Sequence, residues 1–144
     1  MSKLFISTSF SSKVDSDGNV TAEYRDFLQP ILDATKEAGN EYFCAVEEAN
    51  WTMADVDPYE EFKSDLNQIN QASTLLALVD SVVSAGVQIE IGYMLKLLET
   101  DSSKRLILAH PLDQPLSWSN NAISKLPGVS VCSFTSSEDI IAVL

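Results

Sequence analysis

Two carboxylates lie on the apolar sides of two successive predicted helices. At 100° per residue, Glu90 falls at the edge of the apolar stripe that Val87, Ile91 and Met94 form, about one turn into its helix. Asp65 repeats this pattern on the packed side of the preceding helix. Carboxylates on the inward faces of neighbouring helices can converge. A converging pair is suited to catalysis, because one carboxylate can be ionised for attack while the other manages a proton.

Each polar candidate also has a structural interpretation. Glu90 could extend to solvent and interact with the helix dipole, although it lies too far into the helix to be a capping-box acid if Ser84 is the N-cap. Asp65 could be a solvated acid on an acid-rich helix. Asp80 ends an apolar run and is either a turn former or a ligand. Trp51 is either a packing residue or a residue that stacks on a base.

Strand-like and helix-like segments alternate five times along the chain. The predicted strands are 4–7, 42–46, 75–79, 105–109 and the segment "PGVSVCSF", and the predicted helices are 24–38, 58–69, 87–98, 118–125 and 136–144. Pro30 conflicts with the first helix, which must either kink there or begin late. The alternation predicts an α/β fold with a parallel sheet and helices on both faces.

Ligands of open α/β sheets bind beyond the carboxyl ends of the strands. The loops expected there are "STSFSSK", "EEANWTM", "DSVVSAG" and "HPLDQP". The serines of the first loop serve either as turn and cap residues or as ligands of an anion, which backbone N–H groups at a helix N-terminus can also hold. The candidate site therefore combines Glu90 and Asp65 with residues of these loops.

Composition narrows the classes of partner. A chain of 144 residues is a single-domain length, and its formal net charge of −12 argues against a nucleic acid polymer and against an anionic membrane surface. The start "MSKLFIST" lacks the apolar stretch of a signal peptide, and we expect a cytoplasmic protein. Cys44 and Cys132 lie in apolar runs and are expected to be buried free thiols. With His110 as the only histidine and no metal-ligand spacing, we expect neither a metal nor another cofactor.

The segments "SAGVQIEIGYML" and "KSDLNQIN" resemble the nucleoside 2-deoxyribosyltransferase family, which includes the 2'-deoxynucleoside 5'-phosphate N-hydrolases. The family signature is a Gly four residues before a catalytic Glu, followed by an aliphatic residue and Gly. Gly86, Glu90, Ile91 and Gly92 match it, and Asp65 matches an Asp-Leu element on the previous helix. The resemblance covers most of the chain. It implies one nucleoside 2-deoxyribosyltransferase-like domain over residues 1–144, with a flavodoxin-like three-layer α/β/α sandwich and a five-stranded parallel sheet.

The resemblance also implies a reaction and a substrate, a small-molecule nucleoside or nucleotide. Glu90 would attack C1' of the sugar and form a glycosyl ester, as in retaining glycosidases, while Asp65 would help protonate the leaving base. A second base that intercepts the ester would give transfer, and water would give hydrolysis. The substrate-binding residues expected from the loops and the resemblance are Ser7, Ser9, Phe10, Ser11, Trp51, Asp80, Ser84 and Gly86.

The two branches of the family differ at the substrate's 5' end. Ser11 stands where the phosphohydrolase branch has an Arg, with Lys13 nearby, which argues against phosphate. Ser84 matches the phosphohydrolase branch, which argues for it. A phosphate is expected among Ser9, Ser11, Ser12 and Ser84.

Family members complete each site with residues of a neighbouring subunit. We therefore expect a homo-oligomer, a dimer or higher, with Ser117, Asn120 or Asn121 reaching across. Trp118, in the same segment, could equally be a core residue.

Two other functions remain open from the sequence. One is a non-catalytic nucleotide or nucleotide-sugar sensor on the same fold, which binding without cleavage would favour. The other is a flavodoxin-like electron carrier, which the acidity would suit. The first loop lacks the glycine of a flavin phosphate loop, and a colourless protein would exclude a flavin.

Overall fold

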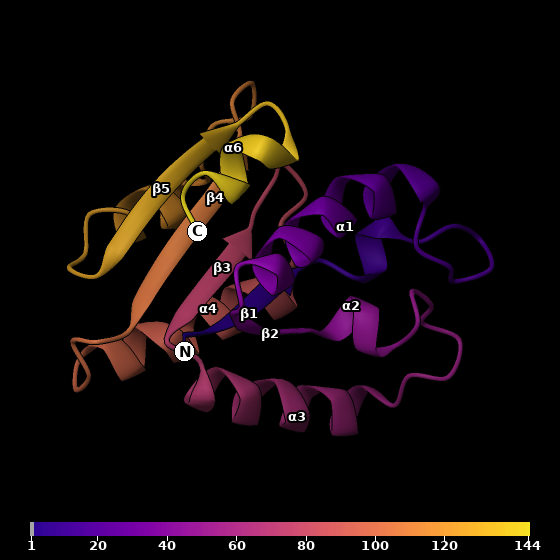
Figure 1. The fold of residues 1–144 in the computed structure, drawn as a ribbon, viewed down its shortest axis with the longest axis horizontal. Helices are drawn as coiled ribbons and strands as arrows, with labels where there is room; N and C mark the ends of the chain where they lie inside the picture. Colours follow the sequence, from indigo (N-terminus) through magenta and orange to yellow (C-terminus); the bar gives the residue numbers. More distant parts are fainter. Residues whose placement is uncertain (1) are drawn as a thin grey trace.

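Five parallel strands form one sheet in a computed structural model that describes residues 2–144. The strand order is β2-β1-β3-β4-β5 (Figure 1). The strands are β1 (Lys3–Thr8), β2 (Glu41–Cys44), β3 (Thr74–Leu78), β4 (Arg105–Pro111) and β5 (Val129–Phe134). This is the flavodoxin-like order, so the predicted five-stranded parallel sheet is confirmed.

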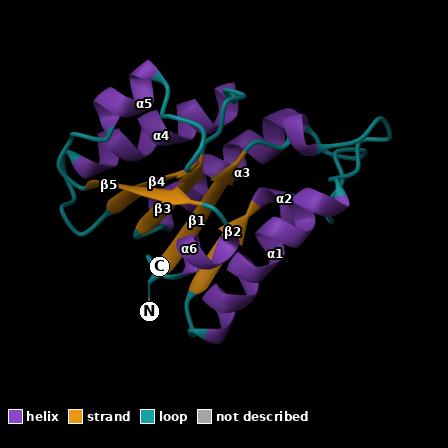
Figure 2. Ribbon diagram, turned by 90° about the horizontal axis from the view of Figure 1, so that it is seen from above, coloured by secondary structure: helices purple, strands orange, loops and turns teal. Residues whose placement is uncertain are grey.

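Helices cover both faces of the sheet (Figure 2). On one face lie α1 (Ala22–Glu37) and α6 (Ser137–Ile141), and on the other lie α3 (Pro58–Gln71), α4 (Ala85–Leu98) and α5 (Trp118–Ile123). Two further short elements, the 3₁₀ turn η1 (Ser11–Lys13) and α2 (Ala45–Glu48), follow β1 and β2. No helix within residues 2–144 combines the length and the apolar character needed to cross a bilayer.

The core is divided into two layers by the sheet. Along β1, Leu4 and Ile6 pack in the layer on the α1 side, whereas Phe5 packs in the layer under α3 and α4. All five residues of β3 are buried, as expected for a central strand covered on both faces. Since side chains alternate along a strand, Ser7 points to the same side as Phe5, toward α4. The thiols of Cys44 and Cys132 are free and buried, as predicted.

The segment after β2 differs from its prediction. Residues 42–46 were expected to be a strand and "EEANWTM" a loop, but β2 ends at Cys44 and α2 covers Ala45–Glu48. The last pairing of this edge strand is Ile6 with Cys44, beyond which β1 pairs only with β3. β1 itself continues to Thr8, but the chain leaves its edge after Cys44, turns into a helix and still buries Val46.

The first helix resolves the conflict at Pro30. It begins at Ala22, after the Thr21 N-cap, and continues through Pro30 to Glu37, so a late start is excluded. A proline in this place leaves the carbonyl of Asp26 without its helical donor, and Asp26 is exposed, so water can satisfy it. Gly39, with φ of +76°, follows the helix end as predicted. The two C-terminal helices are shorter than predicted and end at Ile123 and Ile141.

Candidate active site

Glu90 is buried on α4, with 8% of its surface exposed. The helix begins after Ser84, whose hydroxyl accepts a hydrogen bond from the Val87 N–H at 3.3 Å. Glu90 is therefore well inside the helix, on the side that faces the sheet. Its Oε2 accepts a hydrogen bond of 2.8 Å from the Ser7 hydroxyl near the end of β1. The alternative that Glu90 extends to solvent is wrong, and Ser7, expected to bind substrate, is a partner of this carboxylate.

Asp65 is buried on α3, with 6% of its surface exposed. The Asp57 carboxylate caps this helix by accepting from the N–H groups of Tyr59 and Glu60, each at 3.0 Å, and Pro58 takes the first position. The interpretation of Asp65 as a solvated acid is wrong. Its Oδ1 is buried and has no hydrogen-bond partner in the described chain. A buried acceptor without a donor is uncommon and is expected to receive one from a ligand or from water.

Burial shifts the protonation of both carboxyls toward the neutral form. Desolvation, followed by the charge of Glu61, raises the pKa of Asp65 to about 7. Desolvation raises the pKa of Glu90 to about 8, with the Ser7 hydrogen bond lowering it and Asp65 and Glu61 adding to the rise. Neither carboxylate forms an ion pair within residues 2–144. Two neighbouring buried acids that titrate near neutrality are typical of sites for proton transfer or nucleophilic attack.

Ser9 and Ser84 meet at the N-terminus of α4. Together with Asp80, Gln88 and Asn120 they line a small cavity of about 10 Å³, which is room for about one water molecule. The Ser9 and Ser12 hydroxyls are 2.6 Å apart. The structure thus brings three of the four serines expected around a phosphate into one group. Ser11 is exposed at the start of η1 and does not line this cavity.

Gly86 occupies the second position of α4, beside this cavity. A Cβ built on Gly86 would meet only the Ser84 Oγ, at 3.8 Å, which is ordinary contact. The protein itself therefore does not require glycine here, and the open backbone is available for close approach of a ligand.

Asp80 has the turn-forming role that its position at a strand end suggested, and it also forms an ion pair. Its Oδ1 accepts from the Val82 N–H at 2.8 Å, which is a turn-forming bond, and its Oδ2 pairs with the Lys13 amine at 2.5 Å. The same amine lies 5.0 Å from the ring centroid of Tyr24. Asp80 also lines a second cavity of about 450 Å³, on the α1 side. The Lys13–Asp80 pair therefore lies between the two cavities.

Gln88 is a site residue that the sequence interpretation missed. Its Nε2 donates to Asn120 Oδ1 at 3.1 Å, and its Oε1 is buried without a hydrogen-bond partner in the described chain. In the sequence, Gln88 lies two residues before Glu90, which places it on a different side of the helix, so the helical pattern did not indicate a role for it. Asn120, expected to reach a neighbouring subunit, is 5% exposed and lines the cavity of its own chain.

Two expected substrate contacts belong to the core on the α1 side. Trp51 is 9% exposed and packs in that core, with the Arg25 guanidinium 4.7 Å from its ring centroid. Phe10 packs against the same core. The structure does not bring either residue to Glu90, so Trp51 is corrected to a packing residue. It has a positive φ of 62°, after Asn50 with φ of 54°.

The segment before α5 presents a large exposed side chain. Ser117 is the N-cap of this helix and accepts from the Asn120 N–H at 3.2 Å, which occupies it within its own chain. Asn121 is exposed. Trp118 is 88% exposed, so the alternative that it is a core residue is wrong. No group of three or more His, Cys, Asp or Glu residues that could hold a metal ion occurs within residues 2–144.

Solved structures share this architecture over nearly the whole chain. The CMP N-glycosidase of Clostridium botulinum is 15% identical with a TM-score of 0.70, and the alignment covers 98% of this chain and 95% of that one. The 2-deoxyribosyltransferase of Bacillus psychrosaccharolyticus is 16% identical with a TM-score of 0.65, covering 97% and 90%. The corresponding enzyme of Leishmania mexicana is 12% identical with a TM-score of 0.58, covering 95% and 82%. The chain has the 2-deoxyribosyltransferase fold.

This fold is the one that the resemblance of the Glu90 and Asp65 segments implied. No family model matches the sequence, and no curated protein matches it. The likeness to 2-deoxyribosyltransferases is thus one of architecture, with identities of 12–16% in these three structures. What the chain does with this architecture has to be argued from its own side chains.

Proposed function

We propose that this chain is an enzyme that cleaves or transfers at the N-glycosidic bond of 2'-deoxynucleosides or their 5'-monophosphates. The observation that carries the proposal is the buried carboxylate pair, Glu90 held by Ser7 and Asp65 with an unpartnered oxygen. The named structures with this fold support it, because they are described as acting on CMP or as transferring deoxyribosyl groups.

Glu90 is proposed as the nucleophile. Its ionised carboxylate attacks C1' of the sugar, the bond between C1' and the base nitrogen breaks, and a glycosyl ester forms. The Ser7 hydroxyl supports this role because its hydrogen bond favours the ionised form. The ester is then resolved by water, which gives hydrolysis, or by a second base, which gives transfer.

Asp65 is proposed to manage the proton of the leaving base. Its raised pKa of about 7 lets Asp65 hold a proton near neutral pH, and because Glu90 also has a raised pKa, of about 8, the reactive form is the one in which the proton is on Asp65 and Glu90 is ionised. The unpartnered Oδ1 of Asp65 is free to bind the base directly. Glu61 supports this role, because its charge helps to keep Asp65 protonated.

The 5' end of the substrate is proposed to bind at the N-terminus of α4, near Ser9, Ser84 and Gly86. The first turn of a 14-residue helix offers N–H groups and a favourable dipole to an anion. A phosphate would also compete with Asp80 for the Lys13 amine. The cavity of about 10 Å³ at Ser84 is too small for a phosphate, so binding requires this region to open.

A homo-oligomer is part of the proposal. Val82 and Leu112 are 56% and 66% exposed and lie on the loops after β3 and β4. A 2.8 Å hydrogen bond from the Ser81 N–H to Gln114 joins these loops. Trp118 is 88% exposed, and these exposed apolar side chains are the ones that we propose a second copy covers.

The deciding experiment follows base release by chromatography. The protein is incubated with each deoxynucleoside, each deoxynucleoside 5'-monophosphate and CMP, with and without a second free base as acceptor. Free base alone identifies a hydrolase, and a new nucleoside identifies a transferase. A quenched reaction analysed by peptide mass spectrometry should carry the sugar on the peptide that contains Glu90.

Variants separate the roles. Glu90→Ala should abolish base release, whereas Glu99→Gln, at the exposed end of the same helix, should retain it. Full turnover by Glu90→Ala would refute the nucleophile. If every nucleotide binds and none is cleaved, the sensor function replaces the enzyme. For the 5' end, Ser84→Ala should lower kcat/KM selectively for the monophosphate, and an equal effect on the free nucleoside would refute a phosphate at Ser84.

A further inference from the structure

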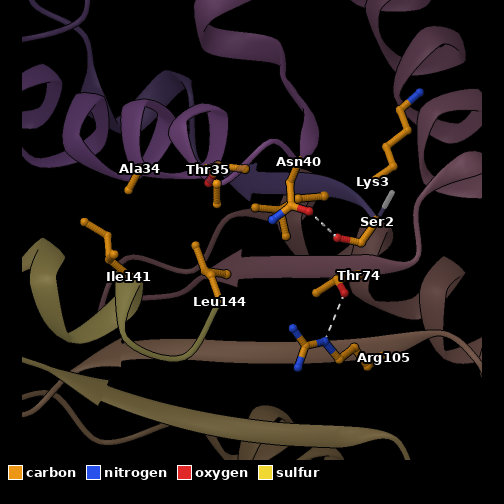
Figure 3. Close-up of a pocket in the computed structure, with 11 residues that line it drawn as sticks. Ser2, Lys3, Ala34, Thr35, Asn40, Thr74, Arg105, Ile141 and Leu144 are labelled. Atoms are coloured by element: carbon orange, nitrogen blue, oxygen red, sulfur yellow. Dashed lines mark hydrogen bonds between the residues drawn. The ribbon is translucent and has the colours of Figure 1, made fainter.

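A further cavity lies at the amino ends of the strands, opposite the carboxylate pair. It measures about 170 Å³ and is enclosed by α1, α6 and the first residues of β1, β3 and β4 (Figure 3). Along β1, Lys3 and Ser7 are four residue steps apart, or about 13 Å, so this cavity is separate from the Ser7–Glu90 site. A cavity of this volume has room for a small organic molecule.

The charge around this cavity is opposite to that of the chain. The sequence has 21 acidic and 9 basic residues, yet the charged side chains that line the cavity are Lys3 and Arg105, with no Asp or Glu among them. Neither cation forms an ion pair with another group of residues 2–144. The Lys3 amine is bonded to Gln71 at 2.9 Å and extends away from the cavity in Figure 3. Arg105 is therefore the cation available to a ligand.

The Arg105 side chain is oriented by the strand next to it. Its Nε donates to the hydroxyl of Thr74, a residue only 6% exposed, at 3.0 Å. Figure 3 shows the guanidinium on the side of the cavity where Leu144 and Ile141 lie. Its two terminal NH₂ groups have no hydrogen-bond partner in the described chain. A planar fork with free donors is suited to bidentate binding of a carboxylate or another oxyanion.

The remaining wall is largely apolar. The apolar residues that line it are Leu4, Ala34, Ala38, Ile141 and Leu144, beside the polar Ser2, Thr35 and Asn40. Small-molecule sites commonly combine an apolar lining with a few polar groups that fix orientation. An oxyanion head on Arg105 would leave an apolar body of a few carbon atoms against these side chains.

We propose that this cavity binds a small organic anion, with its oxyanion on the Arg105 guanidinium and its apolar body between α1 and α6. The ligand is a short-chain or compact carboxylate rather than a nucleotide, because a volume of about 170 Å³ is well below that of sites for larger ligands. The site is independent of the proposed catalysis at Glu90.

Titration of ¹⁵N-labelled protein tests the proposal, with hexanoate, hexanol and inorganic phosphate as probes at constant pH and ionic strength. Hexanoate has both an oxyanion and an apolar chain, whereas hexanol has only the apolar chain and phosphate is only an oxyanion. Saturable shifts are expected for amides of residues 2–4, 34–40 and 141–144, with hexanoate bound at least about tenfold more tightly than hexanol or phosphate. No saturable shift, or shifts centred on residues around Glu90, would overturn the proposal.

Three variants assign the contacts. Arg105→Gln should weaken hexanoate by about tenfold or more. Ala34→Leu keeps both cations and fills the cavity, so it should also abolish binding, and it remains informative if Arg105→Gln folds poorly. Arg25→Gln alters the other arginine of the sequence, which lies over Trp51, and should leave hexanoate affinity unchanged. Wild-type affinity in Arg105→Gln or in Ala34→Leu would refute the site.

Discussion

Glu90→Gln should make the protein more stable at pH 8 while abolishing base release. Burial raises the pKa of Glu90 from 4.5 to about 8, so the folded state holds a proton that the unfolded state has lost. Wild-type stability therefore falls as pH rises from about 4.5 to about 8 and is flat above that. At about 1.4 kcal/mol per pH unit, the three units between pH 5 and pH 8 correspond to about 4 kcal/mol. Glutamine does not ionise in this pH range, so the variant does not lose this stability as the pH rises.

Urea unfolding at pH 5 and at pH 8 measures the effect. The difference in unfolding free energy, Glu90→Gln minus wild type, should become more positive by about 4 kcal/mol between the two pH values. Glu99→Gln removes a carboxylate that is 63% exposed on the same helix, and it controls for the change in net charge. A difference that stays the same at both pH values would show that Glu90 is ionised in the folded state throughout, and would refute the argument from burial.

Three further predictions concern the surroundings of Glu90. Ser7→Ala removes the hydroxyl that lowers the pKa of Glu90, so the pH at which kcat/KM falls on the acid side should move upward; an unmoved profile would argue against Glu90 as the ionised nucleophile. Gly86→Ala should raise the free energy of unfolding, measured with urea, by about 0.5–1 kcal/mol, but it should also raise KM. Gly92→Ala, with open space around its Cβ, should raise the free energy of unfolding by the same amount and leave KM unchanged. Trp118→Lys should yield monomers by light scattering, and retained oligomers would place the interface elsewhere.

The sheet and its main helices were predictable because their patterns are local. Continuous apolar runs such as Leu75 to Val79 can only be satisfied by a strand covered on both faces. The error after β2 has a tertiary cause. β1 continues for two residues past its last pairing with β2, yet Ala45 and Val46 begin α2, and Val46 is buried in the core on the α1 side. Whether such a short apolar run is buried as a strand or as a helix is decided by tertiary packing, which the local pattern does not show.

The candidate site was predictable where helical angle decides burial. Glu90 and Asp65 share a side of their helices with apolar residues, so their burial follows from 3.6-residue periodicity. The loop residues had no such periodicity. Trp51 packs into the α1-side core within a turn where Asn50 and Trp51 both have positive φ, a conformation that asparagine favours but that a tryptophan does not indicate. Gln88 became visible only through its contact with Asn120, which is 32 residues away.

Within residues 2–144 no cation pairs with Glu90, and this arrangement is suited to the proposed chemistry. Two buried carboxylates without an ion pair are costly in the free protein, which is why both pKa values rise. In glycosidic bond cleavage the sugar develops positive charge at the transition state. That charge would interact favourably with Glu90 and Asp65, whereas a lysine or arginine at the same place would oppose it. Interactions that strengthen as the sugar becomes cationic lower the barrier, because they stabilise the transition state more than the bound substrate.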